Sequence, residues 1–249
     1  LILESSQAFY QAARRQKSAT LLVKATQALN YSGSTLTATV KRVQKEAQYL
    51  VEADHSAIWL LDSDRHDLWT HLPQPDGSWR EVRSPIGQGY VGRVAESGMI
   101  LNIPCDVYER PDSHLAREVD QQSRYRTFSL LCMPVFDTAG QLIAVTQLFN
   151  KYRSGMSEIA VVLDPENVDI PICFRTSFTD EDEFFLLAFN IHAGAAIERA
   201  LQHEHLQAEV NRLQAENRQL QTFAKQAEIN RLPSTPSLNA ESLDRPSSD

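Results

Sequence analysis

The sequence predicts an α+β domain in which antiparallel strands are flanked by long helices. Apolar side chains recur at helical spacing in residues 4–29 and again in residues 36–51. From Ser56 the pattern changes to short β-prone runs separated by Asp, Pro and Gly turns, as in an antiparallel meander. A last long helix is expected from Thr179 to about Gln226. Helices therefore open and close the chain, with strands between them.

The two N-terminal helices are separated by the sequence Tyr-Ser-Gly-Ser at residues 31–34, which breaks the helical pattern. The second helix should begin near Ser34 or Thr35 and end before Asp54. Its apolar residues fall on one face at steps of three and four: Leu36, Val40, Val43, Ala47, Leu50 and Val51.

The middle of the chain alternates extended runs with two short helices. Residues 85–100 begin with a Gly-rich turn, which is followed by a short helix that ends at Gly98. A polar helix is expected from Ser113 to Gln122. A hairpin should turn at residues 137–140. The expected strands are SAIWLLD, DLWTHL, SWREVRS and ILNIP, and then the two hairpin arms FSLLCMPVF and QLIAVTQLFN.

The last helix changes character along its length. Residues 184–200 are mostly apolar and should pack on the sheet, whereas later apolar residues take heptad places: Leu206, Leu213 and Leu220 at d, and Val210, Asn217 and Ala224 at a. This pattern predicts a coiled coil and a parallel homodimer, the alternative being that it packs back on its own domain. The expected parts are residues 1–33, a connecting helix; 34–200, the domain; 201–228, the coiled coil; and 229–249, a disordered linker.

Composition excludes several classes of partner. The 249 residues carry a formal charge of −8, so no basic surface is expected for a nucleic acid or an anionic membrane. Cys105, Cys132 and Cys173 lack metal-ligand spacing and are odd in number, which predicts no metal site and no disulfide framework. The N-terminus lacks the pattern of a secretory signal. We therefore expect a cytoplasmic protein.

The glycines of GQGYVG, residues 87–92, do not have the G-x-G-x-x-G spacing of a dinucleotide site. They stand before a helix, whose first N–H groups and positive dipole end favour an anion. The alternative is that they only form a tight turn. No histidine lies beside a nucleophile signature, so no catalytic triad is predicted.

Five residues form a spaced motif: Asn150, Lys151, Phe178, Asp182 and Glu183. This pattern, N-K followed by F-x-x-x-D-E, resembles the signature of cyclic-nucleotide-binding GAF domains, as found in mammalian cyclic-nucleotide phosphodiesterases and cyanobacterial adenylyl cyclases. Further blocks of residues 30–200 resemble the family in the same order, among them ADHSAIWLLD, IGQGYVGRVAESGMILNIP and LLCMPVFDTAGQLIAVTQLFNK.

The resemblance implies a six-stranded antiparallel sheet with helices on both faces, the first and last helices on one and the ligand on the other. It implies an ion pair between Lys151 and Asp182 that supports the pocket. The phosphate would meet N–H groups around Tyr90 and Val91 and the helix near Ala116. The ribose and base would face Asp120, Ser123, Thr127 and Gln147. One departure from the family is residues 152–177, where EIAVVL and VDIPICF flank DPEN as an added β-hairpin.

The function implied is a non-catalytic regulatory module that binds cAMP or cGMP and signals to an output domain elsewhere in the full chain. Gln147 favours cAMP, since its amide offers an acceptor and donors that complement adenine. Three alternatives stay open. They are a ligand-free GAF dimerisation module, a bilin photosensor, which lacks its usual Cys-His pair here, and a methionine sulfoxide reductase, which needs clustered reactive cysteines.

Overall fold

The computed structural model describes residues 2–29, 35–73, 79–156, 163–166 and 169–229. The chain divides into two units, residues 1–204 and residues 205–249. The predicted linker at 229–249 falls almost wholly outside the described residues. The first unit holds the domain, and the second begins within the last helix.

The two N-terminal helices are α1 (Ile2–Ala28) and α2 (Leu36–Leu50). Thr35 caps α2, because its hydroxyl accepts a hydrogen bond from the Ala38 N–H at 3.3 Å. Such a cap satisfies an N–H that has no partner inside the helix. The predicted start of this helix is confirmed.

The sheet contains six antiparallel strands in the order β3-β2-β1-β6-β5-β4. The long strands β1 and β6 pair at its centre, from Ala53 opposite Lys151 to Leu60 opposite Ala144. The predicted α+β class and the six-stranded sheet are confirmed. The strands are β1 (Ala53–Asp62), β2 (Asp67–Pro73), β3 (Trp79–Pro85), β4 (Leu101–Ile103), β5 (Leu130–Phe136) and β6 (Leu142–Lys151).

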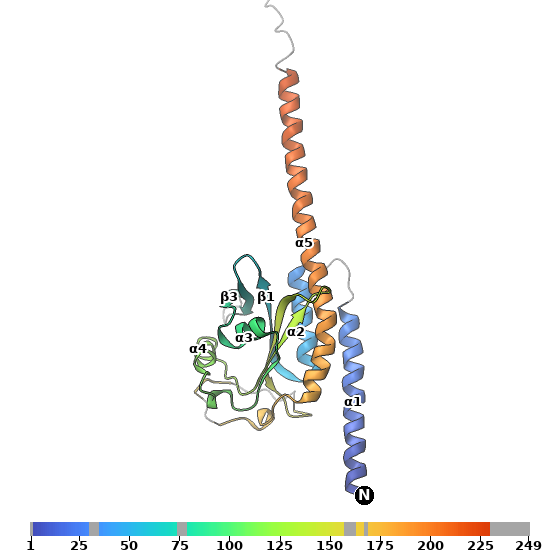
Figure 1. The fold of residues 1–249 in the computed structure, drawn as a ribbon, viewed down its shortest axis with the longest axis vertical. Coiled ribbons are helices and arrows are strands. Elements are labelled where there is room, and N and C mark those ends of the chain that lie inside the picture. Colours follow the sequence, from blue (N-terminus) through green and yellow to red (C-terminus); the bar gives the residue numbers. More distant parts are fainter. Residues whose placement is uncertain (1, 30–34, 74–78, 157–162, 167–168, 230–249) are drawn as a thin grey trace, which may run out of the picture. The chain divides into compact units, whose positions relative to one another are not determined.

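One face of the sheet packs against α2 and the first part of α5 (Asp180–Ile229), with the end of α1 beside them (Figure 1). Alternate residues of each strand point to this face of the sheet. Their apolar side chains and those of both helices form one continuous core. Gly194 lets α5 approach closely, because a side chain there would clash with the carbonyl of Phe136. The largest fully buried members are Ile58, Leu131, Met133, Leu148, Leu186, Phe189 and Ile197.

The opposite face carries two shorter helices, α3 (Gly89–Ser97) and α4 (His114–Ser123) (Figure 1). Gly98 ends α3 in the left-handed conformation at φ 65°, as the sequence predicted. Gly92 holds α3 against the end of β3, since a Cβ at this position would clash with the Pro85 carbonyl. These two helices place their N-terminal turns over the sheet.

The predicted hairpin within residues 152–177 is wrong where the structure describes it. Residues 158–162 of its first arm lie outside the described residues. The second arm forms a 3-10 helix at Ile172–Phe174 instead of a strand. Pro171 offers no N–H for a strand ladder, and Phe174 is buried against Phe128 with ring centroids 6.0 Å apart. Burial of this aromatic pair therefore decides the conformation.

The helix of the second unit exposes its heptad residues. Leu206, Val210, Leu213 and Leu220 are between 45% and 68% exposed. By length and composition α5 could cross a membrane, but half of its most apolar window is buried in the fold, as in the core helix of a globular domain.

Candidate functional site

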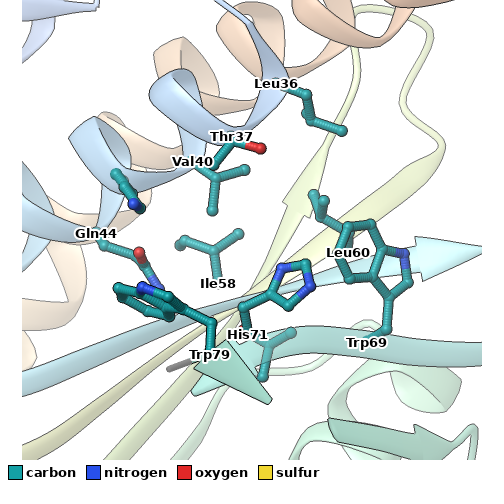
Figure 2. Close-up of a pocket in the computed structure, with 11 residues that line it drawn as sticks. Leu36, Thr37, Val40, Gln44, Ile58, Leu60, Trp69, His71 and Trp79 are labelled. Atoms are coloured by element: carbon teal, nitrogen blue, oxygen red, sulfur yellow. The ribbon is translucent and has the colours of Figure 1, made fainter. Parts of the chain in front are cut away.

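The hollows of the structure differ in size and chemistry. Between α2 and the strands β1 to β3 lies a gap of about 40 Å³, where Val40 and Gln44 point toward Ile58 and Trp79 (Figure 2). This gap has room for little more than one water, which takes about 30 Å³. A groove beside α4 measures about 670 Å³, but its lining is mostly polar.

A third hollow, of about 270 Å³, lies under α3 and α4 and has the character of a ligand site. Its volume is just below the range of about 300–1,000 Å³ that small-molecule sites occupy, and its walls are mostly apolar with a few polar groups. It brings together six of the seven predicted ligand residues: Tyr90, Val91, Ala116, Asp120, Thr127 and Gln147. We take this cavity as the candidate site.

Helix N-termini line one side of the cavity. Gly89, Tyr90 and Val91 begin α3, and the hydrogen bond that follows them in the helix runs from the Gly92 N–H to the Gln88 carbonyl at 3.1 Å. Ala116 lies in the first turn of α4. The first N–H groups of a helix have no partner inside it, so both helices can offer donors to an anion here.

Two lining residues carry a formal charge, and both are already engaged. The guanidinium of Arg83 pairs with Asp67 at 2.6 Å, with Glu81 at 2.8 Å and with Asp62 at 2.9 Å. It therefore has three carboxylates of its own and is poorly placed to neutralise a ligand. An anion in this cavity would depend on backbone N–H groups.

Asp120 is the other charged lining residue, and its carboxylate accepts three hydrogen bonds. Thr127 donates from its N–H at 2.7 Å and from its hydroxyl at 2.8 Å, and Tyr108 donates its hydroxyl at 2.9 Å. Burial raises the pKa of Asp120, although these bonds act in the opposite direction. Asp120 thus fixes the end of α4 to the segment that precedes β5.

Gln147 lies in the floor of the cavity on the central strand β6. Ala57 of β1 stands directly opposite, and Cys132 of β5 lies on its other side. The indole N–H of Trp59 donates to the side-chain oxygen of Gln147 at 2.7 Å. The sequence interpretation overlooked Trp59, although it follows Ala57 at the two-residue step of one strand face.

Ser123, the seventh predicted ligand residue, is not among the residues that line the cavity. It is exposed at the end of α4, and its hydroxyl donates to the Val119 carbonyl at 2.8 Å. Besides Trp59, the lining includes residues without any sequence signal for a site: Arg83, Leu115, Val119, Leu130 and Phe149.

The spaced motif forms a buried network at the edge of the domain. The Lys151 ammonium donates to Asp182 at 2.9 Å and to the Val51 carbonyl at 2.6 Å, and Lys151 and Asp182 expose only 5% and 8% of their side chains. The other Asp182 oxygen accepts from the Thr179 N–H at 2.9 Å. Asp182 therefore joins the sheet to the start of α5, without lining the cavity.

Asn150 connects this network to the segment that borders the cavity. Its side-chain oxygen accepts from the Phe128 N–H at 2.6 Å, and its amide donates to the Arg126 carbonyl at 2.8 Å. Thr127, between these two residues, bonds to Asp120. The segment 126–128 is thus held from the cavity side by α4 and from the other side by β6.

The remaining motif residues hold the short edge strand β4. The amide of Asn102 donates to the Phe178 carbonyl at 3.1 Å and to the Glu183 carboxylate at 2.7 Å. Phe178 itself is 4% exposed. All five residues of the motif therefore have structural contacts in the fold.

The cysteines are free, and Cys132 and Cys173 are buried. Burial raises the pKa of Cys105 to about 11 and also raises that of Cys132 and Cys173. Thiols in this state are poor nucleophiles at neutral pH. Among the described residues, no group of three or more His, Cys, Asp or Glu side chains is placed to hold a metal ion.

Comparison with known proteins identifies the family of the domain. The family model described as the GAF domain matches residues 35–197, and the chain belongs to this family. A dual 3',5'-cyclic-AMP and -GMP phosphodiesterase 11A of Takifugu rubripes is 32% identical over 163 residues, 61% of this chain and 15% of that protein. A probable 3',5'-cyclic phosphodiesterase of Caenorhabditis elegans is 28% identical over 151 residues, 56% of this chain and 20% of that protein.

This chain therefore spans a fifth or less of the length of these two relatives. Among solved structures, the GAF domain of a phosphoenolpyruvate-protein phosphotransferase from Coxiella burnetii superposes with a TM-score of 0.56 and 18% identity, covering 77% of this chain and 98% of that one. At this identity the likeness shows the fold alone.

Proposed function

We propose that this chain is a regulatory module that binds a cyclic nucleotide, with cAMP favoured over cGMP, and signals to an output domain elsewhere in the full protein. The observation that carries the proposal is the cavity of about 270 Å³, where two helix N-termini face a mostly apolar floor. A cyclic nucleotide has one anionic group and one flat base, which match these two sides.

The phosphate would lie against the N–H groups around Tyr90, Val91 and Ala116. A cyclic phosphate carries a single charge, which suits a site whose one lining cation, Arg83, is already neutralised. The ribose would lie near Thr127 and Asp120. These groups position the ligand, and no proton transfer is proposed.

Gln147 would read the base. Its oxygen accepts from Trp59 and keeps a second lone pair, and its amide nitrogen is a donor. Adenine offers a matching pair, an amine donor and a ring-nitrogen acceptor. In the same pose, guanine would place its O6 acceptor at the amide oxygen and its N1–H donor at the amide nitrogen, so like groups would face each other. This difference supports the preference for cAMP.

The relatives support the class of ligand. Two of them are named as cyclic-nucleotide phosphodiesterases, and this chain matches a small part of each. We propose a non-catalytic role for the matched part, because the raised pKa values of Cys105, Cys132 and Cys173 argue against thiol chemistry. Free thiols also suit the proposed cytoplasmic location.

Ligand binding in the cavity would change the conformation of α5 through the segment 126–128. A ligand that draws Thr127 and Asp120 inward would pull on Asn150, and Lys151 next to it is bonded to α5 through Asp182. A coupling of this kind is usually worth about 1–3 kcal/mol. The output would be a change in α5 and in the coiled coil that we propose beyond it.

Calorimetric titration with cAMP and cGMP, after any copurified ligand is removed, tests this function. Ala116→Pro removes the N–H of a lining residue in the first turn of α4, and we expect it to weaken cAMP binding about 10- to 100-fold, the worth of a charge-assisted hydrogen bond. His114→Pro is the matched control, since it places proline in the same turn outside the cavity lining. Absence of binding to the folded wild-type protein would refute the proposal.

A second candidate is a ligand-free dimerisation module. It is favoured by the internal hydrogen bonds that the Asp120 carboxylate and the Gln147 side-chain oxygen accept, because these bonds form without a ligand. In the titration this module would bind neither nucleotide, and it would still be dimeric.

We propose a parallel homodimer through the heptads of residues 206–224 in either case. The exposed Leu206, Leu213 and Leu220 would form the seam, and facing Asn217 side chains would fix its register. Sedimentation at tens of micromolar tests this step. A monomer at that concentration would refute it, and Asn217→Val should raise stability while loosening oligomer specificity.

A further inference from the structure

We infer that Trp59 is a specificity-determining residue of the cavity, because it fixes which way the amide of Gln147 faces. This inference rests on the proposed cyclic-nucleotide function and adds the residue that sets the choice of base. The Trp59 indole nitrogen donates a hydrogen bond of 2.7 Å to the Gln147 side-chain oxygen.

The chemistry of the indole group assigns the orientation of the amide. An amide oxygen and nitrogen have similar size, and only their hydrogen bonds distinguish them. The indole N–H can donate and cannot accept. The amide atom at 2.7 Å from it must therefore be the oxygen, because the –NH₂ group there would set donor against donor.

The hydrogen bond between Trp59 and Gln147 is buried. Trp59 and Gln147 are each 8% exposed, so water cannot readily replace either partner. Both side chains rise from the central strands β1 and β6, which pair in register from Ala53 to Leu60. A flipped amide would leave the buried indole N–H without an acceptor, which costs about 1–3 kcal/mol. The amide is therefore locked by elements that do not move easily.

A locked amide selects between bases, whereas a free amide adapts to both. If the amide could rotate, it would present its oxygen or its nitrogen as each base required, at little cost. With the oxygen held by Trp59, the nitrogen and one lone pair remain for the ligand. Gln147 then complements the amine and ring nitrogen of adenine, whereas guanine in the same pose carries an acceptor and a donor in the reverse order and needs the flipped amide, which breaks the Trp59 bond.

The small residue at position 57 leaves this arrangement accessible to a ligand. Ala57 stands opposite Gln147 in the pairing of β1 and β6, and it lines the same cavity. On the other side, Cys132 is buried with its pKa raised by desolvation and contacts Gln147 as a neutral thiol. The flanking strands therefore offer no competing strong acceptor or charge to the amide.

The test is the ratio of the dissociation constants of cAMP and cGMP in Trp59→Phe. This change removes the indole N–H and keeps an aromatic ring. We expect wild type to favour cAMP and the ratio to fall about tenfold toward equality in the variant, the discrimination of one base-edge hydrogen-bond pair. Trp69→Phe is the matched control, since Trp69 lies by the small gap on the other face of the sheet (Figure 2).

A direct measurement covers the case in which Trp59→Phe fails to fold. The indole N–H resonance of Trp59 should be protected from solvent exchange in wild type and in Gln147→Glu, which keeps an acceptor, and should lose protection in Gln147→Met. An unprotected resonance in wild type, or an unchanged ratio in folded Trp59→Phe, would overturn the inference. If wild type binds neither nucleotide while the resonance is protected, the proposed function fails and the locked amide stands.

Discussion

The two faces of the sheet are built from the same strands, yet one is filled and the other is hollow. On the face of α2 and α5, apolar side chains form a continuous core, and the hollow there measures about 40 Å³. On the face of α3 and α4, an apolar cluster surrounds a cavity of about 270 Å³. A cavity lowers stability, because its lining lacks packing partners. We interpret the hollow face as the one kept open for a ligand.

The polar groups of the two faces also differ. The Lys151 and Asp182 charges, buried at the edge of the filled face, are paired at 2.9 Å. In the cavity, the helix N-termini face open space, and Gln147 keeps donors and a lone pair for another molecule. The difference predicts where substitutions damage the fold and where they damage binding.

The largest effect is expected at the paired charges. Asp182→Ala would leave Lys151 buried with the Val51 carbonyl and with Glu52 at 3.9 Å, and would remove an acceptor for Thr179. Breaking a buried pair on one side costs about 3–5 kcal/mol. We expect that loss in the free energy of unfolding, measured with urea.

Asp180→Ala is the control for this substitution, since Asp180 is exposed in the same turn of α5. It removes an equal charge from the helix N-terminus, at a cost of about 0.3–1 kcal/mol. Equal losses in the two variants would contradict the special role of the buried pair. The family resemblance implies only that this ion pair supports the pocket, and the depth of its burial is the reason to expect a loss of stability as well.

Substitution of one glycine on each face compares the two faces directly. Gly194→Ala would push α5 away from Phe136 in the filled core, and Gly92→Ala would push α3 away from Pro85 beside the cavity. Overpacking of this kind costs about 1–3 kcal/mol. We expect the Gly194 variant to lose stability with little change in nucleotide affinity, and the Gly92 variant to lose affinity as well. Titration and urea unfolding of both variants decide whether the faces are separable in this way.

The sequence specifies the elements well, because each carries a local signal. Periodicity places the helices, and turn residues such as Gly98 mark their ends. The cavity residues Tyr90, Ala116 and Gln147 came from a family resemblance, since nothing local distinguishes them from core residues. The Trp59 bond could not be predicted, because it depends on the register of β1 against β6 and on a side-chain rotamer.

Two expectations failed for identifiable reasons. The β-prone run VDIPICF predicted a strand, but Phe174 is buried against Phe128 and Tyr152 and the backbone turns to allow it. Ser123 was expected to line the cavity, but it lies at the end of α4, where a helical turn carries it to the surface. In the first case, packing between distant segments outweighs the local pattern, and in the second, the place of Ser123 in its helical turn differs from what the family resemblance implies.

A smaller effect is expected at Asp120, and it depends on pH. Burial raises the pKa of this carboxyl in the fold, so the folded state binds more protons than the unfolded state above about pH 4. Stability contributed by Asp120 is therefore lost as pH rises through the folded pKa. Asp120→Asn does not titrate and can keep bonds to Tyr108 and Thr127, so its cost at pH 7 should be within about 1 kcal/mol.

Urea unfolding of wild type and Asp120→Asn between pH 4 and pH 7 measures this difference. The variant should gain relative to wild type as the pH rises. A gap in the free energy of unfolding that stays constant over this range would show that Asp120 has the same pKa in both states.

The smallest effect is expected at Ser123, and it separates the cavity from its surroundings. Its hydroxyl bonds within α4 to the Val119 carbonyl and is exposed, so Ser123→Ala should change stability and nucleotide affinity by less than about 0.5 kcal/mol. Thr127 is the contrasting position, because its hydroxyl donates to Asp120 at 2.8 Å inside the cavity lining. Thr127→Ala should cost about 1 kcal/mol, as one lost hydrogen bond does. A loss of affinity in Ser123→Ala as large as that in Thr127→Ala would mean that the end of α4 reaches the ligand, and that the cavity closes further when it is filled.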